Sequence, residues 1–515
     1  MRCVPNLTLS RSPVIPSIMS SPDPSATTDS ARSLALNARE ASRTLKRLGY
    51  PARQAVLRAL AAALVEPRNM KEILEANEKD VEAATAASAV APSPASAAAS
   101  SSSSSAASAA PKLSAASLAR LSLSPSKLRT LSSGLLQLAD PTFVSDPVNR
   151  LLKETLVAEE LVLQQRSVPL GVLLVIFESR PDVLPQLVGL AVLSSNGLLL
   201  KGGSESRHTL AKVYELATRA ITDATQGAVR GEHLVSLLSG RSAVPALLAL
   251  DDCVDLVIPR GGASLVSFVK SHTRIPVLAH ADGVCHAYLD AEYGGVSNLA
   301  NMIDLVRDAK CDYPAACNAL ETLLVHEGLL QQPGLEGDAS AVHSIVRRLK
   351  AAGVTLKLGP RAVAHAAAAP SSSPFAGLTP AASLHTEYGD LTLCIELVSS
   401  LDAAITHIHA WGSSHTELIL TSNSRTAERF LDEVDAACVF HNASTRFADG
   451  FRMGLGAEVG ISTSRIHARG PVGVEGLCST KWSLRSGRPQ GQMVEPFQKG
   501  ESKFIHKQVQ IHARL

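Results

Sequence analysis

The sequence predicts an α/β protein with two lobes, each built around an open parallel sheet, and three observations lead to this prediction. The chain has 515 residues, which is too long for a single hydrophobic core. From residue 172 onwards, short apolar runs alternate with segments of helical periodicity, which is typical of parallel strands connected by helices. Glycine pairs follow several of these runs, at the strand ends where such sheets bind ligands.

The N-terminal 29 residues are expected to form a disordered tail. Residues 1–22 contain Arg2 and Arg11 but no acidic residue, which faintly resembles a transit peptide, and Met19 is an alternative start. The repeated arginines and the amphipathic period of a transit peptide are missing. We therefore expect a cytoplasmic protein.

The first lobe is expected to comprise residues 30–147 and 165–283 and to bind a nucleotide cofactor. Helical spacing of apolar residues predicts two or three amphipathic helices before residue 81. Residues 83–117 are almost wholly Ala, Ser and Pro, and they are expected to form a disordered low-complexity insertion. No GxGxxG fingerprint follows the first strand, which argues against an ordinary Rossmann dehydrogenase. The predicted strands are 172–177, 198–200, 234–238, 256–258 and 276–278.

The second lobe is expected to comprise residues 284–445. Residues 362–383 are rich in Ala, Ser and Pro and are predicted to be a surface loop. The polar C-terminal region contains an alternating stretch at 504–511, which predicts a strand added to another element or to another subunit. The predicted strands of this lobe are 287–289, 323–326, 393–398, 418–421 and 438–440.

Composition narrows the possible partners. Lysine and arginine total 49 against 47 acidic residues, so a net charge of +2 offers no strong field for nucleic acid or an anionic membrane. The longest apolar run, 169–177, is about half of the roughly 20 residues that a bilayer requires. Eight cysteines without a CxxC pair argue against a zinc site and a disulfide framework, so we expect no metal and a reducing compartment. The partner is expected to be a small molecule.

Cys317 is the most informative residue, because the residues around it are typical of a reactive thiol that precedes a strand. A thiolate can hold an acyl group as a thioester until a hydride reaches it, which defines an acyl-transferring dehydrogenase. Pro314 predicts the first turn of a short helix, whose free N–H groups would favour the thiolate of Cys317. From the residues alone, Cys317 as a small buried core residue stays open as an alternative.

Several short motifs occur in order along the chain. They are Val168-Pro-Leu-Gly-Val172, Phe177-Glu-Ser-Arg-Pro181, Leu200-Lys-Gly-Gly-Ser-Glu205, Ile258-Pro-Arg-Gly-Gly262, His280-Ala-Asp-Gly283, Cys317-Asn-Ala-Leu-Glu-Thr-Leu323, Glu387-Tyr-Gly-Asp-Leu391, His415-Thr-Glu417, Asn442-Ala-Ser-Thr-Arg-Phe-Ala-Asp-Gly450 and His467-Ala-Arg-Gly-Pro471. In this order they resemble γ-glutamyl phosphate reductase, or glutamate-5-semialdehyde dehydrogenase, a branch of the aldehyde dehydrogenase superfamily. The resemblance covers residues from about 30 to about 480.

The resemblance implies an aldehyde dehydrogenase-like fold and a reaction. NADPH would reduce L-glutamate 5-phosphate to glutamate 5-semialdehyde and phosphate, the second step of proline biosynthesis from glutamate. A glutamate kinase is expected on a separate chain. The resemblance also implies a homo-oligomer formed through a strand-bearing arm, here residues 148–164 and 480–515, with residues 446–479 bridging the lobes.

The resemblance implies that Cys317 is the nucleophile, and the substrate's anions require cations. Arg180 and Arg446 are the candidates, with Ser444 and Thr445 beside Arg446, although each arginine could equally form a structural ion pair. Asn318 either places the substrate or orients the turn.

The expected cofactor-binding residues follow predicted strands. Lys201, with Gly202, Gly203 and Ser204, either reaches the cofactor's ribose or phosphate or forms a solvated turn. Arg260, with Gly261 and Gly262, either holds the pyrophosphate or forms a simple strand-to-helix turn. Glu387 resembles the superfamily glutamate that binds the nicotinamide ribose, or else it is a surface acid.

His280 occupies the position where general aldehyde dehydrogenases carry a glutamate that activates water. Its absence suits a reductase, because hydrolysis of the thioester would waste the substrate. His280 is interpreted either as a polar core residue or as an acid toward the departing phosphate. Cys285 and Cys311 are interpreted as packing residues, with a resolving thiol as the alternative.

Two other functions stay open. An NAD(P)-dependent dehydrogenase that oxidises a free aldehyde is disfavoured by the missing glutamate at position 280. A non-catalytic partner of glutamate kinase is disfavoured by the presence of Cys317, Lys201 and Glu387.

Overall fold

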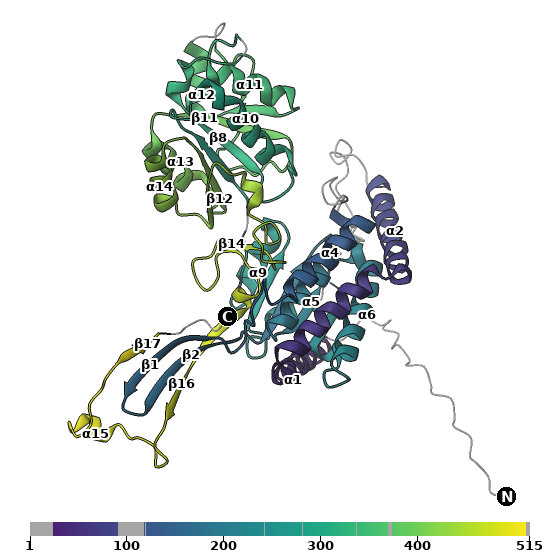
Figure 1. Cartoon of the computed structure of the whole chain (residues 1–515). Coiled ribbons are helices and arrows are strands. Elements are labelled where there is room, and N and C mark those ends of the chain that lie inside the picture. Colours follow the sequence, from purple (N-terminus) through teal and green to yellow (C-terminus); the bar gives the residue numbers. More distant parts are fainter. Residues whose placement is uncertain are drawn as a thin grey trace, which may run out of the picture.

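The structure is a computed structural model that describes residues 24–90, 118, 120–240, 243–280, 282–335, 337–368 and 373–510. Figure 1 shows two α/β lobes, joined by irregular chain, and a β-arm that projects away from them. Among the described residues, no helix is both long and apolar enough to cross a lipid bilayer.

The first lobe contains a four-stranded parallel sheet with the order β5-β4-β3-β6. The strands are β3 (Val172–Phe177), β4 (Gly197–Lys201), β5 (Val235–Leu238) and β6 (Leu256–Arg260). All residues of β3 and β4 are buried, as the continuous apolar runs predict for a sheet covered on both faces. The predicted strand 276–278 contributes only an isolated bridge between Val257 and Val277, because Pro276 has no N–H for a ladder.

Helices cover both faces of this sheet. They are α1 (Pro24–Val65), α2 (Pro67–Val90), α4 (Pro125–Leu138), α5 (Val183–Leu193), α6 (Arg207–Ala224), α7 (Gly231–Leu234), α8 (Ala243–Leu248) and α9 (Ala263–His272). Helix α5 is almost wholly buried beneath α1, α4 and α6. Helix α1 bends at Gly49, which has a positive φ of 81° and precedes Pro51 by two positions.

Two expected disordered regions begin or end differently from the prediction. Residues 1–23 of the tail lie outside the described part, but α1 already begins at Pro24, a residue suited to a first helical turn. Helix α2 extends to Val90 and so includes the first eight positions of the predicted insertion 83–117, because alanine is the strongest helix former. The stretch 91–117 of this insertion also falls outside the described residues.

The second lobe contains a seven-stranded parallel sheet with the order β10-β9-β11-β8-β7-β12-β13. The strands are β7 (Cys285–Leu289), β8 (Leu320–His326), β9 (Thr355–Leu358), β10 (Thr379–Pro380), β11 (Thr392–Val398), β12 (Thr416–Leu420) and β13 (Cys438–His441). The covering helices are α10 (Val296–Cys311), α11 (Ala341–Ala351), α12 (Pro360–Ala368), α13 (Leu401–Trp411) and α14 (Ser424–Glu433).

The predicted surface loop 362–383 is partly wrong. Helix α12 occupies its beginning, since an alanine-rich stretch after Pro360 is a good helix start, and β10 pairs with β9 near its end. The strands of the two sheets fall within the two predicted lobes, whose exact boundaries stay a prediction.

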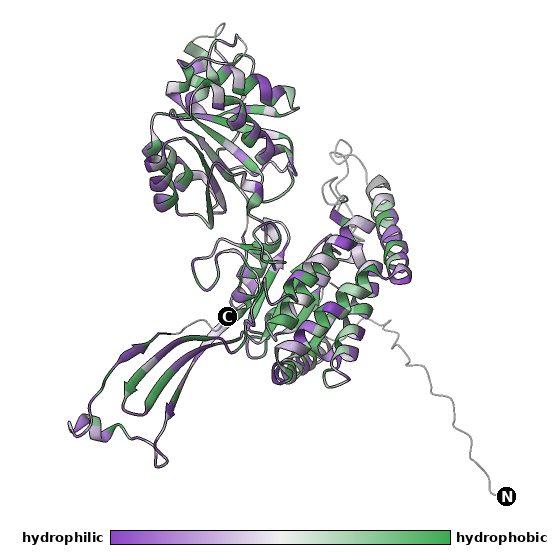
Figure 2. Cartoon of the chain, in the orientation of Figure 1, coloured by the Kyte–Doolittle hydropathy of each residue, from purple (hydrophilic) through white to green (hydrophobic). Residues whose placement is uncertain are grey.

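The arm is an antiparallel sheet with the order β16-β2-β1-β17. Its strands are β1 (Leu151–Ala158), β2 (Leu161–Pro169), β16 (Cys478–Ser486) and β17 (Lys507–Val509), with the short helix α15 (Glu495–Gln498) between the last two. Figure 2 shows hydrophobic residues interspersed along its strands, and Trp482 and Leu484 on β16 are 52% and 60% exposed. The strand expected at 504–511 forms only over 507–509.

Candidate active site

Cys317 lies in a turn between α10 and β8, where the two lobes meet. The helix expected from Pro314 is not formed; instead the chain makes consecutive turns, with Ala316 and Ala319 donating to the carbonyls of Tyr313 and Ala316. A helix N-terminus therefore does not stabilise this thiolate, and the prediction on that point is wrong. The thiol of Cys285 donates to the Cys317 carbonyl over 3.3 Å, so Cys285 supports the turn from a fully buried position.

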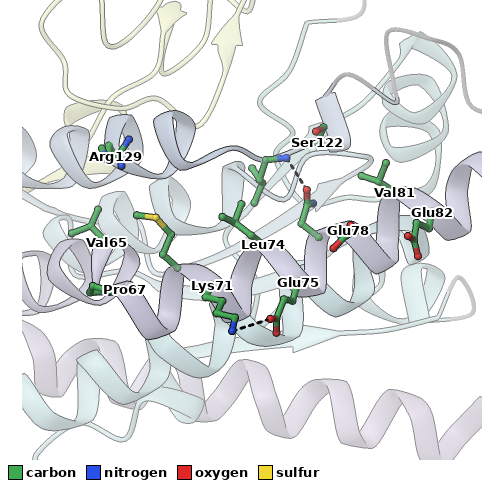
Figure 3. A pocket seen from close by; sticks show the side chains of 13 residues that line it. Val65, Pro67, Lys71, Leu74, Glu75, Glu78, Val81, Glu82, Ser122 and Arg129 are labelled. Atoms are coloured by element: carbon green, nitrogen blue, oxygen red, sulfur yellow. Dashed lines mark hydrogen bonds and ion pairs between the residues drawn. The ribbon is translucent and has the colours of Figure 1, made fainter.

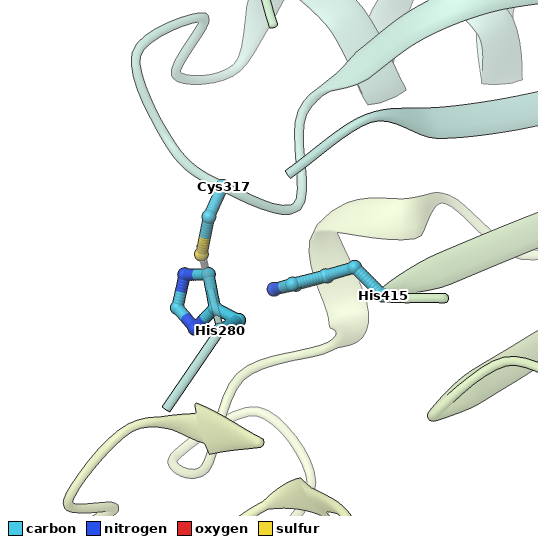
Figure 4. A group of neighbouring side chains, drawn as sticks. All are labelled: His280, Cys317 and His415. Carbon is cyan, nitrogen blue, oxygen red and sulfur yellow. The ribbon is translucent and has the colours of Figure 1, made fainter. Parts of the chain in front are cut away.

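Two histidines flank the Cys317 sulfur (Figure 4). The Nδ1 of His280 is 2.7 Å from the carbonyl of Ile461, which leaves Nε2 for the sulfur. His415 is fully buried, and its Nδ1 lies 2.9 Å from the Thr416 hydroxyl. The sequence motifs contained both residues, but no role was assigned to His415, because nothing local indicates that it faces a cysteine so distant along the chain.

The histidines reverse the effect of burial on the thiol. Burial alone would raise the pKa of Cys317, but the charges and hydrogen bonds of His415 and His280 outweigh it and hold this pKa well below its ordinary value. For His280, burial lowers the pKa, yet the hydrogen bond and charge of Cys317 raise it above its usual value. The lowered pKa of Cys317 and the raised pKa of His280 each favour the charged form of the group over its neutral form.

The three residues stand at one edge of the second sheet. His280, Cys317 and His415 precede β7, β8 and β12, which are neighbours in the order β8-β7-β12. The amino ends of these strands thus face the carboxyl ends of β3, β4 and β6 in the first sheet, which end at Phe177, Lys201 and Arg260. The site lies between two opposed sheet edges.

Gly283 lets the Cys317 turn approach the start of β7. A Cβ at position 283 would lie 2.0 Å from the carbonyl oxygen of Cys317, and only a shift of the backbone could relieve this steric clash. We expect Gly283→Ala to lower kcat/KM at least about tenfold, because a displacement of about 1 Å can cost up to about 10²-fold. Gly473→Ala is the matched control, since its Cβ would meet its nearest atom at an ordinary 3.4 Å. Steady-state kinetics check this; equal activity of the two variants would contradict it.

A cleft of about 500 Å³ opens in front of Cys317 and contains residues of both lobes. Predicted substrate residues Arg180, Asn318 and Arg446 line it, and so do four residues predicted for the cofactor: Arg260, Gly261, Gly262 and Glu387. Glu387 is exposed, and its Oε2 accepts the N–H of Gly283 over 3.0 Å.

Both basic and acidic side chains line this cleft. Arg120, Arg180 and Arg260 line it together, and burial followed by repulsion from Arg260 lowers the pKa of Arg180. Glu458 also lines it, and burial raises the pKa of this carboxyl to about 7. Arg120 and Glu458 were missed by the sequence analysis: Arg120 follows the low-complexity stretch, and Glu458 lies in an irregular segment outside every quoted motif.

Ser444 and Thr445 do not line the cleft. Both are buried at the start of a short 3₁₀ helix (Thr445–Phe447), where the Ser444 hydroxyl accepts the N–H of Arg446. Arg446 forms an ion pair with Asp312 over 3.1 Å while still lining the cleft. Asn318 donates to the carbonyl of Ala448 over 2.8 Å, which ties the cysteine turn to the following irregular segment.

A second cavity, of about 540 Å³, lies at the carboxyl ends of β4 and β5. Lys201, Gly202, Gly203 and Ser204 line it, as the sequence analysis grouped them. Side chains at the two glycines would collide, since a Cβ would lie 2.3 Å from Leu210 at Gly202 and 2.1 Å from Glu205 at Gly203. Glu178 and Glu205 line both this cavity and the cleft, so the two spaces adjoin.

A larger groove of about 940 Å³ lies away from this chemistry, along α2 and the start of α4 (Figure 3). Leu74, Val81 and the aliphatic stems of charged residues line it, and it contains none of the predicted site residues.

The fold defines the class. Two lobes built on parallel sheets, with a small antiparallel arm, form an aldehyde dehydrogenase-like fold. The solved acetylating aldehyde dehydrogenase of Geobacillus thermoglucosidasius shares this fold, with a TM-score of 0.58 and 15% identity over 91% of this chain and 99% of that one. The predicted fold class is confirmed.

The particular family follows from closer relatives. The chain is 42% identical to the γ-glutamyl phosphate reductase of Synechococcus sp. strain JA-3-3Ab over 472 residues, which cover 90% of this chain and 92% of the relative. The crystal structure of γ-glutamyl phosphate reductase from Thermotoga maritima matches 89% of this chain and 99% of its own, with a TM-score of 0.74 and 31% identity. The chain belongs to the γ-glutamyl phosphate reductase family, as the motifs indicated.

The chain is also similar to part of longer plant proteins. Δ1-Pyrroline-5-carboxylate synthases, including one of Arabidopsis thaliana, are 41% to 45% identical to the chain, which spans 55% to 60% of their length. No protein-family model matches the sequence.

Proposed function

We propose that the protein reduces L-glutamate 5-phosphate with NADPH to L-glutamate 5-semialdehyde and phosphate, the second step of proline biosynthesis from glutamate. One observation carries the proposal most directly: the Cys317 sulfur, beside two histidines, faces a cleft lined by four arginines. The family membership points in the same direction.

Cys317 is the proposed nucleophile. Its sulfur attacks the acyl carbon of the substrate, the C–O bond to the phosphate breaks, and phosphate leaves with the bonding electrons. NADPH supplies a hydride to the resulting thioester, and the C–S bond then breaks to release the aldehyde and regenerate the thiolate. His280, whose pKa is raised by the adjacent Cys317, is placed to hold a proton near the departing groups.

The absence of a carboxylate at position 280 protects the acyl group in this proposal. The position holds an imidazole whose Nδ1 is already engaged by the carbonyl of Ile461, so its remaining nitrogen faces the sulfur rather than a water on the acyl carbon. Hydrolysis of the thioester therefore has no positioned base at residue 280.

The arginines of the cleft are proposed to bind the substrate's anions. Guanidinium groups recognise phosphate and carboxylate by paired hydrogen bonds, and Arg120, Arg180 and Arg260 line the cleft beside Cys317. We therefore assign Arg260 to the substrate rather than to the cofactor pyrophosphate. Arg446 keeps a proposed supporting role, because Asp312 already pairs with it. Glu458 and Asp449 line the same cleft and suit the substrate's ammonium group.

The cavity at the end of β4 is proposed to hold the nucleotide part of NADPH. Two glycines without side chains form part of its wall, and Lys201 adds a positive charge there. Because this cavity adjoins the cleft at Glu178 and Glu205, a cofactor lying there would extend its nicotinamide toward Cys317. Glu387 is proposed to bind the nicotinamide ribose, as in the superfamily.

Further proposals concern the assembly and its surroundings. The exposed β16 edge, with Trp482 and Leu484, supports an oligomer formed through the arm. A glutamate kinase as the source of the acyl phosphate, and a cytoplasmic location, are also proposals.

The reverse reaction tests the function. With glutamate 5-semialdehyde and NADP, we expect NADPH formation to require inorganic phosphate and to fall to the background rate without it, because phosphate must displace the acyl group from Cys317. Absorbance of NADPH measures the rate, and the kinase-coupled forward reaction serves as the control for active enzyme. Turnover that persists without phosphate would instead identify an enzyme that oxidises the free aldehyde.

A further inference from the structure

The three side chains His280, Cys317 and His415 offer the ligand atoms of a soft metal site. Two imidazole nitrogens and one sulfur lie within 4.8 Å of one another. Among the described residues, this is the one group of three or more histidine, cysteine, aspartate or glutamate side chains that lie this close together. Neutral imidazole and thiolate are preferred ligands of Zn²⁺. Three protein ligands with a fourth open position is the usual composition of a zinc site that exchanges its remaining ligand.

Both histidines hold their Nδ1 as metal-bound imidazoles do, in which the nitrogen away from the metal is engaged by the protein. The Nδ1 of His280 is held by the Ile461 carbonyl at 2.7 Å, and that of His415 lies 2.9 Å from the Thr416 hydroxyl. The Nε2 of His415 is buried and has no nitrogen or oxygen partner among the described residues, so the Cys317 sulfur is the group beside it. A buried nitrogen that faces only a sulfur atom can bind a metal ion shared with that sulfur.

The geometry requires only small adjustments. The ligand atoms of a tetrahedral zinc site with such bonds are roughly 3.5 Å apart, so closing from at most 4.8 Å needs about an ångström of side-chain rotation. The two rings meet edge to face with centroids 5.0 Å apart, and Figure 4 shows both directed toward the sulfur. The fourth position opens into the cleft, whose arginines would hold an anionic fourth ligand.

We propose that His280, Cys317 and His415 bind Zn²⁺ and that its binding reversibly blocks the nucleophile. A sulfur lone pair donated to the metal cannot attack an acyl carbon, so the metal acts here as an inhibitor. No bond is made or broken in the substrate and no redox change occurs. This metal binding does not depend on the identity of the substrate, because it is measurable without one.

The test uses the full chain after chelator treatment and a phosphine reductant, titrated with ZnCl₂ in a calorimeter. We expect one equivalent to bind per chain, and Cys317→Ser and His415→Asn each to weaken binding at least tenfold. His272→Asn is the matched control, because the exposed His272 also has its Nδ1 held by a carbonyl, that of Phe268 at 2.8 Å, and it should bind like the parent. Thermal unfolding confirms that each variant is folded.

X-ray absorption of the zinc-loaded parent chain gives an independent answer that needs no variant. One sulfur at about 2.3 Å and two nitrogens at about 2.0–2.1 Å are expected around the metal. Inhibition of turnover by Zn²⁺ and recovery with a chelator should follow the same binding curve. A shell without sulfur, or equal affinity in the parent, Cys317→Ser and His415→Asn, overturns the proposal whatever reaction the enzyme catalyses.

Discussion

Cys317→Ser is expected to lower kcat for NADPH-dependent reduction by about four orders of magnitude or more. A serine hydroxyl is not ionised beside these histidines, and its ester would accept hydride poorly, so both halves of the reaction lose their reactive group. NADPH consumption measured with glutamate, ATP and a separate glutamate kinase gives the rate.

Cys311→Ser is the matched control for this substitution. Cys311 is a half-buried thiol at the end of α10, close in sequence, and packs against the core of the second lobe. It should keep activity within a few-fold of the parent chain. If Cys317→Ser retained comparable activity, the thioester route would be wrong, and equal loss in both variants would indicate a general effect on folding.

His415→Asn has the second largest expected effect, a loss of about 10²–10³-fold in kcat/KM, as expected for removal of a group that governs proton position. The charge and hydrogen bond of this imidazole hold the pKa of Cys317 well below its ordinary value. Removing it favours the neutral thiol, so the pKa of the thiol should rise toward that of an ordinary free thiol and the thiolate fraction at neutral pH should fall.

The pH dependence of Cys317 alkylation by iodoacetamide measures this shift directly. The parent protein should react at a pH well below the range of a free thiol, and His415→Asn should require a higher pH. His272→Asn, on the exposed end of α9, controls for the loss of an imidazole. A parent profile that coincides with that of His415→Asn would contradict the proposed role of the histidine.

Much of the framework could be predicted from the sequence because the strands are strongly apolar. Strand β3 begins and ends where the run Val172–Phe177 does, bounded by Gly171 and a charged residue. In contrast, β9 (Thr355–Leu358) was missed, because Lys357 interrupts its short apolar pattern. The equally short β5 and β13 have no charged residue within their predicted runs, and both were predicted.

The candidate site was predicted less completely, and the reason is topological. The rule that ligands bind at the carboxyl ends of parallel strands pointed to Lys201, Gly202 and Gly203, and these residues line one cavity. The second sheet presents its amino ends instead, so His415, the residue before β12, had no local signal. The expected helix at Pro314 was wrong for a related reason: a proline fits a first helical turn and a tight turn equally well.

The opposed sheet edges have a consequence for how such an enzyme can change. Most groups that meet the acyl phosphate in our proposal lie at the end of a strand or in a connection beside one, whereas the strand interiors pack into the hydrophobic cores of the two lobes. Substitutions in those connections can therefore retune which acid is accepted while thermal tolerance is left intact. Substrate specificity can therefore change, by evolution or by design, without a change in the fold.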